Sequence, residues 1–248
     1  MEREDRSPVG TFYAPGVWSD RAELGPDAAH HALVKRIAVG DLVRLSNGQG
    51  RRATGLIGAV AKRQLVIEVD PASIEEIAEP ARVELWAPVG DRDRMLMLAE
   101  KAVELGATAW QPVVYVRSRS VSPRGEGASF RDKVQLRMIS ALEQSGGAWL
   151  PELRADTTLD AALAADVGAE QGGRLLLEAG GDAIGKVLTE VNAPIRIALG
   201  PEGGLDDGER AQFVRAGWRT VSLGRNVLRF ETAGLAALAI VRAHLGEQ

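Results

Sequence analysis

The feature that most constrains this chain is an alternation of strand-like and helix-like segments from about residue 81 to the end of its 248 residues. Short apolar runs predict strands at 83–87, 113–116, 174–177, 195–199 and 220–223. Helical spacing and end signals predict helices at 91–105, 130–145, 182–191, 206–217 and 231–245. Such alternation is typical of a mostly parallel sheet covered by helices. We therefore expect an α/β fold that binds its ligand beyond the carboxyl ends of the strands.

The N-terminal part of the chain shows a different pattern. Residues 41–70 read as strands, and the dipeptide Asn47-Gly48 between two of them tolerates positive φ and marks a hairpin turn. The acidic segment 71–80 carries a proline near each end, which indicates a join between domains. We expect two domains, a small β-rich unit over 1–76 and the α/β domain over 77–248.

Several classes of function are excluded or disfavoured by what the chain lacks. It has no cysteine, which excludes disulfides, thiolate metal sites and cysteine nucleophiles, and its three histidines do not favour a metal centre. Four of the first five residues are charged, and the segment lacks the apolar core of a signal peptide. No apolar run is long enough to span a bilayer. We expect no metal, no membrane partner and a cytoplasmic location.

Basic residues gather in two stretches although the formal net charge is −4. Nucleic-acid binding depends on a local basic patch rather than on the total charge, so the net charge does not exclude it. The first stretch contains Lys35, Arg36, Arg44, Arg51, Arg52, Lys62 and Arg63. The second contains Arg117, Arg119, Arg124, Arg131, Lys133 and Arg137. Each stretch, taken alone, is equally consistent with an ordinary solvated surface.

A glycine-bearing loop follows the expected strand 195–199. Residues 200–204 read Gly-Pro-Glu-Gly-Gly and lead into a helix that Asp206 and Glu209 start with a capping-box pattern. Glycines let the backbone approach a ligand closely, and the helix N-terminus offers free N–H groups. The pattern also fits an ordinary turn. It is not a phosphate-binding P-loop, because the Gly-Lys-Ser/Thr ending is missing.

A second loop, 223–232, follows the next strand and leads into the last helix. Arg229 and Glu231 then lie beside the expected ligand cleft. A purely structural role is also open for both residues. Glu231 would complement the helix dipole in the first turn, with Arg229 as its ion-pair partner.

The combination of these loops resembles a known family. GPEGGL, about twenty residues and then LG-x-x-VLR-x-ETA resembles the C-terminal signature of the SPOUT methyltransferases, and most closely that of the RsmE family, the 16S ribosomal RNA uridine N3-methyltransferases. Residues 101–106, 143–146 and 30–41 are similar to the family's K-x-x-ELG, EQ-C/S-G and H-x-x-x-V-x-R-x-x-x-G-D segments. The chain departs from the family pattern at Asn226, Phe230 and Gly147, where a basic residue, a threonine and an arginine are usual.

The resemblance implies a fold, an activity and partners. It implies a PUA-like β-barrel that binds RNA over 1–76. Over 77–248 it implies a SPOUT methyltransferase domain, a trefoil-knotted parallel sheet with helices on both faces. It further implies S-adenosylmethionine as cofactor, a homodimer, and methylation of N3 of one uridine in 16S ribosomal RNA of the small subunit. Two alternatives keep this fold: a methyltransferase for another target such as a ribose 2′-hydroxyl, and a non-catalytic RNA-binding factor in ribosome assembly.

The resemblance also implies site residues. Arg229 would stabilise the uracil N3 anion, and Glu231 would orient Arg229 or relay the proton. The expected cofactor-binding residues are Leu177, Glu178, Gly180, Leu199, Gly200, Pro201, Glu202, Gly203, Gly204, Leu223, Gly224, Val227, Leu228 and Thr232. The expected RNA-binding residues are Lys35, Arg36, Arg94, Arg117 and Arg119.

Overall fold

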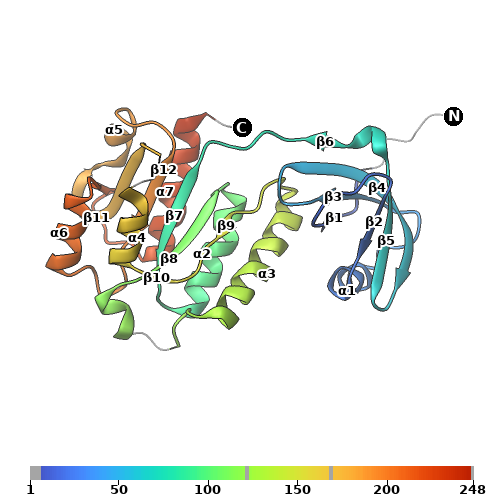
Figure 1. Ribbon diagram of the computed structural model, residues 1–248, viewed down its shortest axis with the longest axis horizontal. Coiled ribbons are helices and arrows are strands. Elements are labelled where there is room, and N and C mark those ends of the chain that lie inside the picture. The colour runs from blue at the N-terminus through green and yellow to red at the C-terminus, as the bar shows by residue number, and fades with distance from the viewer. Residues whose placement is uncertain (1–6, 121–122, 168–169, 247–248) are drawn as a thin grey trace. The chain divides into compact units, whose positions relative to one another are not determined.

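The computed structural model describes residues 7–120, 123–167 and 170–246, and the chain divides into two compact units (Figure 1). The N-terminal unit consists of Met1–Glu79 with Ile139–Leu150, and the C-terminal unit of Pro80–Met138 with Pro151–Gln248. We expected residues 139–150 in the second domain, because the helical pattern from 130 to 145 runs on without a signal of change. Their contacts place them with the N-terminal unit instead.

The N-terminal unit is built on a six-stranded sheet with a short helix, α1 (Pro26–Val34). The strand order is β1 (Thr11–Tyr13), β3 (Leu42–Ser46), β4 (Arg51–Ala61), β5 (Gln64–Val69) and β2 (Arg21–Leu24), and β6 (Glu75–Glu76) also pairs with β4. β1 runs parallel to β3, and the other pairs are antiparallel. The expected join at 71–80 is therefore partly structured, since η1 (Pro71–Ser73) and β6 belong to this unit.

The expected hairpin at Asn47-Gly48 is confirmed. The Asn47 side-chain oxygen accepts hydrogen bonds from the backbone N–H groups of Gln49 and Arg51, at 2.8 and 3.0 Å. Gly48 has a φ of +72°, which glycine adopts without strain. The turn therefore joins β3 to β4 through an asparagine that replaces missing backbone partners.

Residues 139–150 pack on this same turn. The N–H of Gly50 donates to the carbonyl of Ala148, and the N–H of Leu150 donates to that of Gly48, both at 2.9 Å. Gly50 lies so close to Trp149 that a Cβ there would be 2.6 Å from the indole ring. These backbone contacts explain why the segment belongs to the N-terminal unit.

The C-terminal unit contains a seven-stranded sheet in which every observed pairing is parallel. The order is β10 (Thr157–Thr158), β8 (Ala109–Val114), β7 (Val83–Pro88), β12 (Ile195–Leu199), β11 (Gly173–Ala183) and β13 (Arg219–Ser222), with β9 (Glu152–Leu153) also paired to β8. The expected parallel sheet is confirmed. Its core strands β7 and β12 are buried on both faces, as strands covered by helices on both sides are.

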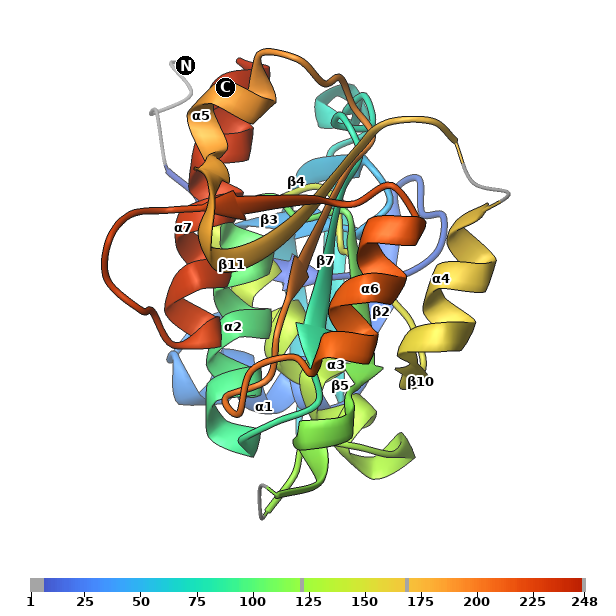
Figure 2. The same cartoon turned by 90° about the vertical axis from the view of Figure 1, so that its left-hand side faces the viewer.

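Helices cover both faces of this sheet, as Figure 2 shows: α2, α5 and α7 lie on one side and α4 and α6 on the other. The helices and the 3₁₀ turn of this unit are α2 (Arg92–Glu104), η2 (Val116–Ser120), α4 (Leu159–Val167), α5 (Ile184–Leu188), α6 (Asp207–Arg215) and α7 (Phe230–Leu245). α3 (Ala128–Ser145) begins in this unit, and its residues from 139 on belong to the N-terminal unit. On the α6 side, Phe213 and Trp86 pack against Trp218 with ring centroids 5.1 and 4.7 Å away. On the α7 side, Gly234 lets the helix approach Leu98 and Leu199.

The capping residues expected from the sequence are confirmed, but the extents of the helices were predicted less well. Asp91 caps α2, and Asp206 with Glu209 forms the expected capping box of α6. The helix expected at 182–191 is only α5, because β11 continues to Ala183. α4 was not predicted, since alanines on all its sides leave no periodic contrast. Among the described residues, no helix is both long and apolar enough to cross a bilayer.

Candidate functional site

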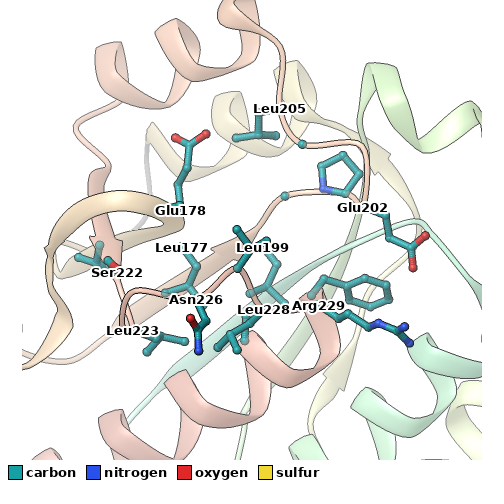
Figure 3. Close-up of a pocket in the computed structure, with 18 of the residues that line it drawn as sticks. Leu177, Glu178, Leu199, Glu202, Leu205, Ser222, Leu223, Asn226, Leu228 and Arg229 are labelled. Carbon is teal, nitrogen blue, oxygen red and sulfur yellow. The ribbon is translucent and has the colours of Figure 1, made fainter.

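Three neighbouring strands, β12, β11 and β13, end side by side in the C-terminal unit. Leu177 near the bend of β11 pairs with Leu199 at the end of β12 and with Val221 of β13, so the three strands reach the same level. A pocket of about 510 Å³ opens beyond this edge (Figure 3). This is the place where parallel α/β sheets bind their ligands.

The pocket gathers most of the residues expected at a cofactor site. Those that line it are Leu177, Glu178, Leu199, Gly200, Pro201, Glu202, Gly204, Leu223, Gly224, Val227 and Leu228. Gly180, Gly203 and Thr232 were also expected and do not line it. Sequence reasoning missed Ala179, Leu205, Val221, Ser222, Asn226, Phe230 and Ala233, whose main signal is that they neighbour the expected positions.

The glycine loop 200–204 forms a tight turn at the mouth of the pocket. The N–H of Gly204 donates to the carbonyl of Pro201 at 2.8 Å, and the φ of Gly204 is +72°. Leu205, which is buried, then leads the chain into α6. Because its glycines have no side chains, the turn presents backbone groups at the wall of the pocket.

Arg117 of η2 holds this loop from outside. Its Nη1 donates to the carbonyl oxygens of Gly203 and Leu205, at 2.7 and 3.5 Å. The stem of Arg117 lies against Gly203, where a Cβ would be 3.1 Å from the Cβ of the arginine. Arg117 was expected to contact RNA only, and the structure shows that it also supports the loop.

Arg94 of α2 reaches the pocket as well, although it was expected to bind RNA. Its Nη1 pairs with the carboxylate of Glu202, and its Nε lies 3.9 Å from Oε1 of Glu231. Glu231 is buried, and its other oxygen, Oε2, has no hydrogen-bond partner among the residues that the structure describes. No pattern in the sequence indicates that Arg94 lies near Glu202 and Glu231, because both glutamates are far from it along the chain.

Arg229 stands at the N-cap of α7 and lines the pocket with an exposed side chain. Within the described part of the chain its guanidinium takes part in no ion pair, and Glu231 faces Arg94 instead. The alternative of an Arg229–Glu231 ion pair is therefore wrong, and no contact shows Glu231 orienting Arg229. Phe230 beside it is buried and packs near Gly90, which explains an apolar ring at this departure from the family pattern.

Glu178 forms the far wall of the pocket, opposite Glu202 in Figure 3. Nε of Arg210 on α6 donates to Glu178 at 2.5 Å. This hydrogen bond and the charge of Glu178 raise the pKa of Arg210. Four leucines, at positions 177, 199, 223 and 228, also line the pocket.

The remaining residues expected to bind RNA do not line the pocket. Lys35 and Arg36 are exposed at the end of α1 in the N-terminal unit. Arg119 lies in η2, and its side chain is outside the described residues. A search of the described residues finds no group of three or more acidic or histidine side chains that could hold a metal ion.

A family model described as an RNA methyltransferase domain matches residues 78–242. The proteins named Ribosomal RNA small subunit methyltransferase E from Synechocystis sp. and Rickettsia conorii are 34% and 26% identical to this chain, over 145 and 238 residues. The first match spans 57% of this chain and only 46% of the Synechocystis protein, about half its length. The second spans 90% of both chains.

Two solved structures resemble the whole chain. One is a methyltransferase from Legionella pneumophila with the bound cofactor SAM, 28% identical with a TM-score of 0.82, covering 96% of this chain and 98% of that one. The other is the Ribosomal RNA small subunit methyltransferase E from Neisseria gonorrhoeae bound to S-adenosyl methionine, 29% identical with a TM-score of 0.80, covering 93% and 95%.

Proposed function

The chain belongs to the RNA methyltransferase domain family, and from this premise we propose that it is an S-adenosylmethionine-dependent methyltransferase of 16S ribosomal RNA. Its target is N3 of one uridine in the small ribosomal subunit, the activity that the RsmE resemblance implies. The observation that carries the proposal is the pocket beyond β11, β12 and β13, which both signature loops line.

The pocket fits a nucleoside cofactor. Its volume of about 510 Å³ lies in the range of cavities that enclose small ligands. The leucines at 177, 199, 223 and 228 offer an apolar surface to an adenine ring. Gly200 and Gly204 line the pocket, so their backbone groups lie where polar contacts to a cofactor can form.

The residues of both loops would hold the cofactor together with the end of β11. When bound, S-adenosylmethionine supplies a methyl group that its sulfonium charge already activates. The proposed cofactor contacts remain those expected from the sequence, with Gly180, Gly203 and Thr232 acting through the backbone or through neighbouring residues. The role of the chain is then to align the target nitrogen with the methyl group and to help the nitrogen lose its proton.

Arg229 would stabilise the negative charge that develops on the uracil carbonyl oxygens when N3 loses its proton. Its guanidinium stays cationic at all relevant pH values. It lines the pocket and is not neutralised by an ion pair among the described residues. A fixed positive charge at the site of developing negative charge is an effective form of catalysis.

Glu231, or a water that it holds, would take the N3 proton. Arg229 cannot easily act as the base, because it remains protonated. Glu231 does not itself line the pocket, which favours transfer through a water. Its buried Oε2 has the free lone pairs that such a water needs.

RNA would contact both units. We assign RNA contacts to Lys35 and Arg36 in the N-terminal unit and to Arg94, Arg117 and Arg119 in the C-terminal unit. Contacts of this kind go mainly to phosphates, so RNA affinity should fall steeply with salt. The target uridine must leave its stack to reach the methyl group.

The finer features of the fold belong to the same proposal. The six-stranded sheet of the N-terminal unit supports a PUA-like barrel. A trefoil knot is supported by the close backbone approach of Gly181 to Thr220, where β11 shifts its register against β13. We also infer a homodimer and a cytoplasmic location, as the family resemblance implies.

Titration of the purified protein with S-adenosylmethionine, followed by transfer of a labelled methyl group to small ribosomal subunits, tests the function. We expect saturable binding and a product that is N3-methyluridine. Absence of binding would favour the non-catalytic assembly factor. A product methylated on the ribose would favour the other methyltransferase.

A further inference from the structure

One guanidinium joins the two loops that line the pocket. Arg94 pairs with Glu202 in the loop after β12 and lies 3.9 Å from Glu231 in the first turn of α7. We propose that Arg94 is a positioning residue of the cofactor site, which sets the distance between these two loops through both carboxylates. The inference rests on the proposed function and adds to it a residue whose role is not to touch the reacting atoms.

The backbone of Arg94 is held firmly at the start of α2. Asp91 caps the helix by accepting hydrogen bonds from the N–H groups of Asp93 and Arg94, at 3.1 and 3.0 Å. One turn further, Leu98 is fully buried and packs near Gly234 of α7. The side chain of Arg94 therefore extends to the pocket from a fixed point, as a positioning residue must.

The burial of these groups makes the contacts stronger than ordinary surface pairs. The side chains of Arg94 and Glu202 are 29% and 34% exposed, and that of Glu231 is 7% exposed. No other cation pairs with Glu231 within the part of the chain that the structure describes. A buried carboxylate that loses its only cation is costly, so the fold depends on Arg94 at this point.

Arginine suits this task because its planar fork presents several N–H donors in different directions. Nη1 addresses Glu202 while Nε faces Glu231, so each carboxylate meets a different edge. A lysine has a single ammonium at the end of a flexible stem and cannot present two edges in this way. Arg94→Lys should therefore keep the charge but only part of the function.

The experiment is a double-mutant cycle on cofactor affinity, measured by calorimetric titration of S-adenosylmethionine. Arg94→Gln and Glu202→Gln are made singly and together, and a second cycle pairs Arg94→Gln with Glu231→Gln. We expect Arg94→Gln to weaken binding about tenfold, Arg94→Lys to weaken it less, and each double variant to bind clearly better than the product of its single effects predicts.

The matched control is Arg219→Gln. Arg219 pairs with Glu190 at 2.7 Å and lies at the end of β13 away from the pocket. Arg219 also lies 3.7 Å from Asp182, so this variant likewise removes an arginine that faces two carboxylates, and cofactor affinity should not change. A general loss of stability would lower affinity in both arginine variants, whereas positioning affects only Arg94.

The same cycles are measured on the unfolding of the ligand-free protein, so that the inference can fail separately from the function. If the wild type does not bind S-adenosylmethionine, the proposed function fails. The coupling energies from the unfolding cycles then still decide whether Arg94 joins the two loops. If the wild type binds and the effects of Arg94→Gln multiply independently with both glutamate variants, the inference is overturned. Unchanged affinity in Arg94→Gln would overturn it as well.

Discussion

Nη1 of Arg117 donates a hydrogen bond to the carbonyl oxygen of Gly203 at 2.7 Å. An arginine that the sequence assigned to RNA thus supports the backbone of the loop expected to hold the cofactor. Arg94 does the same through Glu202 from another element. Two arginines that we propose to contact RNA therefore also contact the loop that we propose to hold the cofactor.

The Arg117 contact gives the first prediction. Arg117→Ala should weaken S-adenosylmethionine binding about threefold to tenfold, because a charged donor to the Gly203 carbonyl is lost. Calorimetric titration measures this. Arg124→Ala is the matched control, since Arg124 pairs with Glu126 and does not touch the loop. Unchanged affinity in Arg117→Ala would show that the loop keeps its shape unaided.

The close approach of Gly181 in β11 to Thr220 in β13 gives the second prediction. A Cβ at Gly181 would lie 2.7 Å from backbone atoms of Thr220 and Val221, which cannot move aside cheaply. Gly181→Ala should lower the free energy of unfolding by about 1–3 kcal/mol, measured by denaturant titration. Gly185→Ala, with no atom within 4 Å, should be neutral or slightly stabilising. Equal changes in the free energy of unfolding in the two variants would contradict this close approach at Gly181.

Arg229 gives the third prediction. Arg229→Ala should lower kcat by about a hundredfold or more and leave cofactor affinity nearly unchanged, since its charge acts on the transition state. The kcat of Arg229→Lys should lie between those of the wild type and Arg229→Ala. Arg225→Ala, in the same loop but not lining the pocket, is the control. A large loss of cofactor affinity in Arg229→Ala would point to a binding role instead.

A buried ion network on the opposite end of the sheet gives a pH prediction. Burial alone would raise the pKa of Glu84, but Arg154 and Arg82 outweigh it through charge and hydrogen bonds and lower that pKa. A lowered folded-state pKa means that Glu84 stabilises the fold above its ordinary value of 4.5, and that this stabilisation is lost as the pH falls through the folded-state pKa.

Glu84→Gln should therefore lower the free energy of unfolding by about 3 kcal/mol at pH 7. The difference from wild type should shrink as the pH falls below 4.5, the ordinary pKa of the carboxyl group. Denaturant titrations at several pH values between 7 and 3 measure it. A difference that stays constant over this range would show that the charge of Glu84 does not matter.

The parts of the fold that short sequence patterns encode were predictable. The strand 195–199, the cap at Asp91 and the capping box at Asp206 were found because the neighbouring residues in the chain decide them. Eleven expected residues line the pocket because parallel strands bring their carboxyl ends to one edge. The resemblance to the RsmE signature named these residues, and the topology of parallel sheets predicted the edge at which they meet.

What could not be predicted depends on contacts between distant residues. The pairing of Arg94 with Glu202 joins residues 108 positions apart, and no periodicity records it. The packing of residues 139–150 on the Gly48 turn could not be predicted either, because the helical pattern in the sequence continues through residue 139 unchanged. β11 continues past Leu177 because Gly181 can lie against the backbone of Thr220, which only the folded chain reveals.

The most direct test of the proposed activity is mass spectrometry of 16S ribosomal RNA from cells that lack this protein. The account predicts that one uridine loses one methyl group at N3. The methyl should return with the wild-type chain and not with Arg229→Ala produced at the same level. Ribosomal RNA with unchanged methylation in the deleted cells would contradict the account.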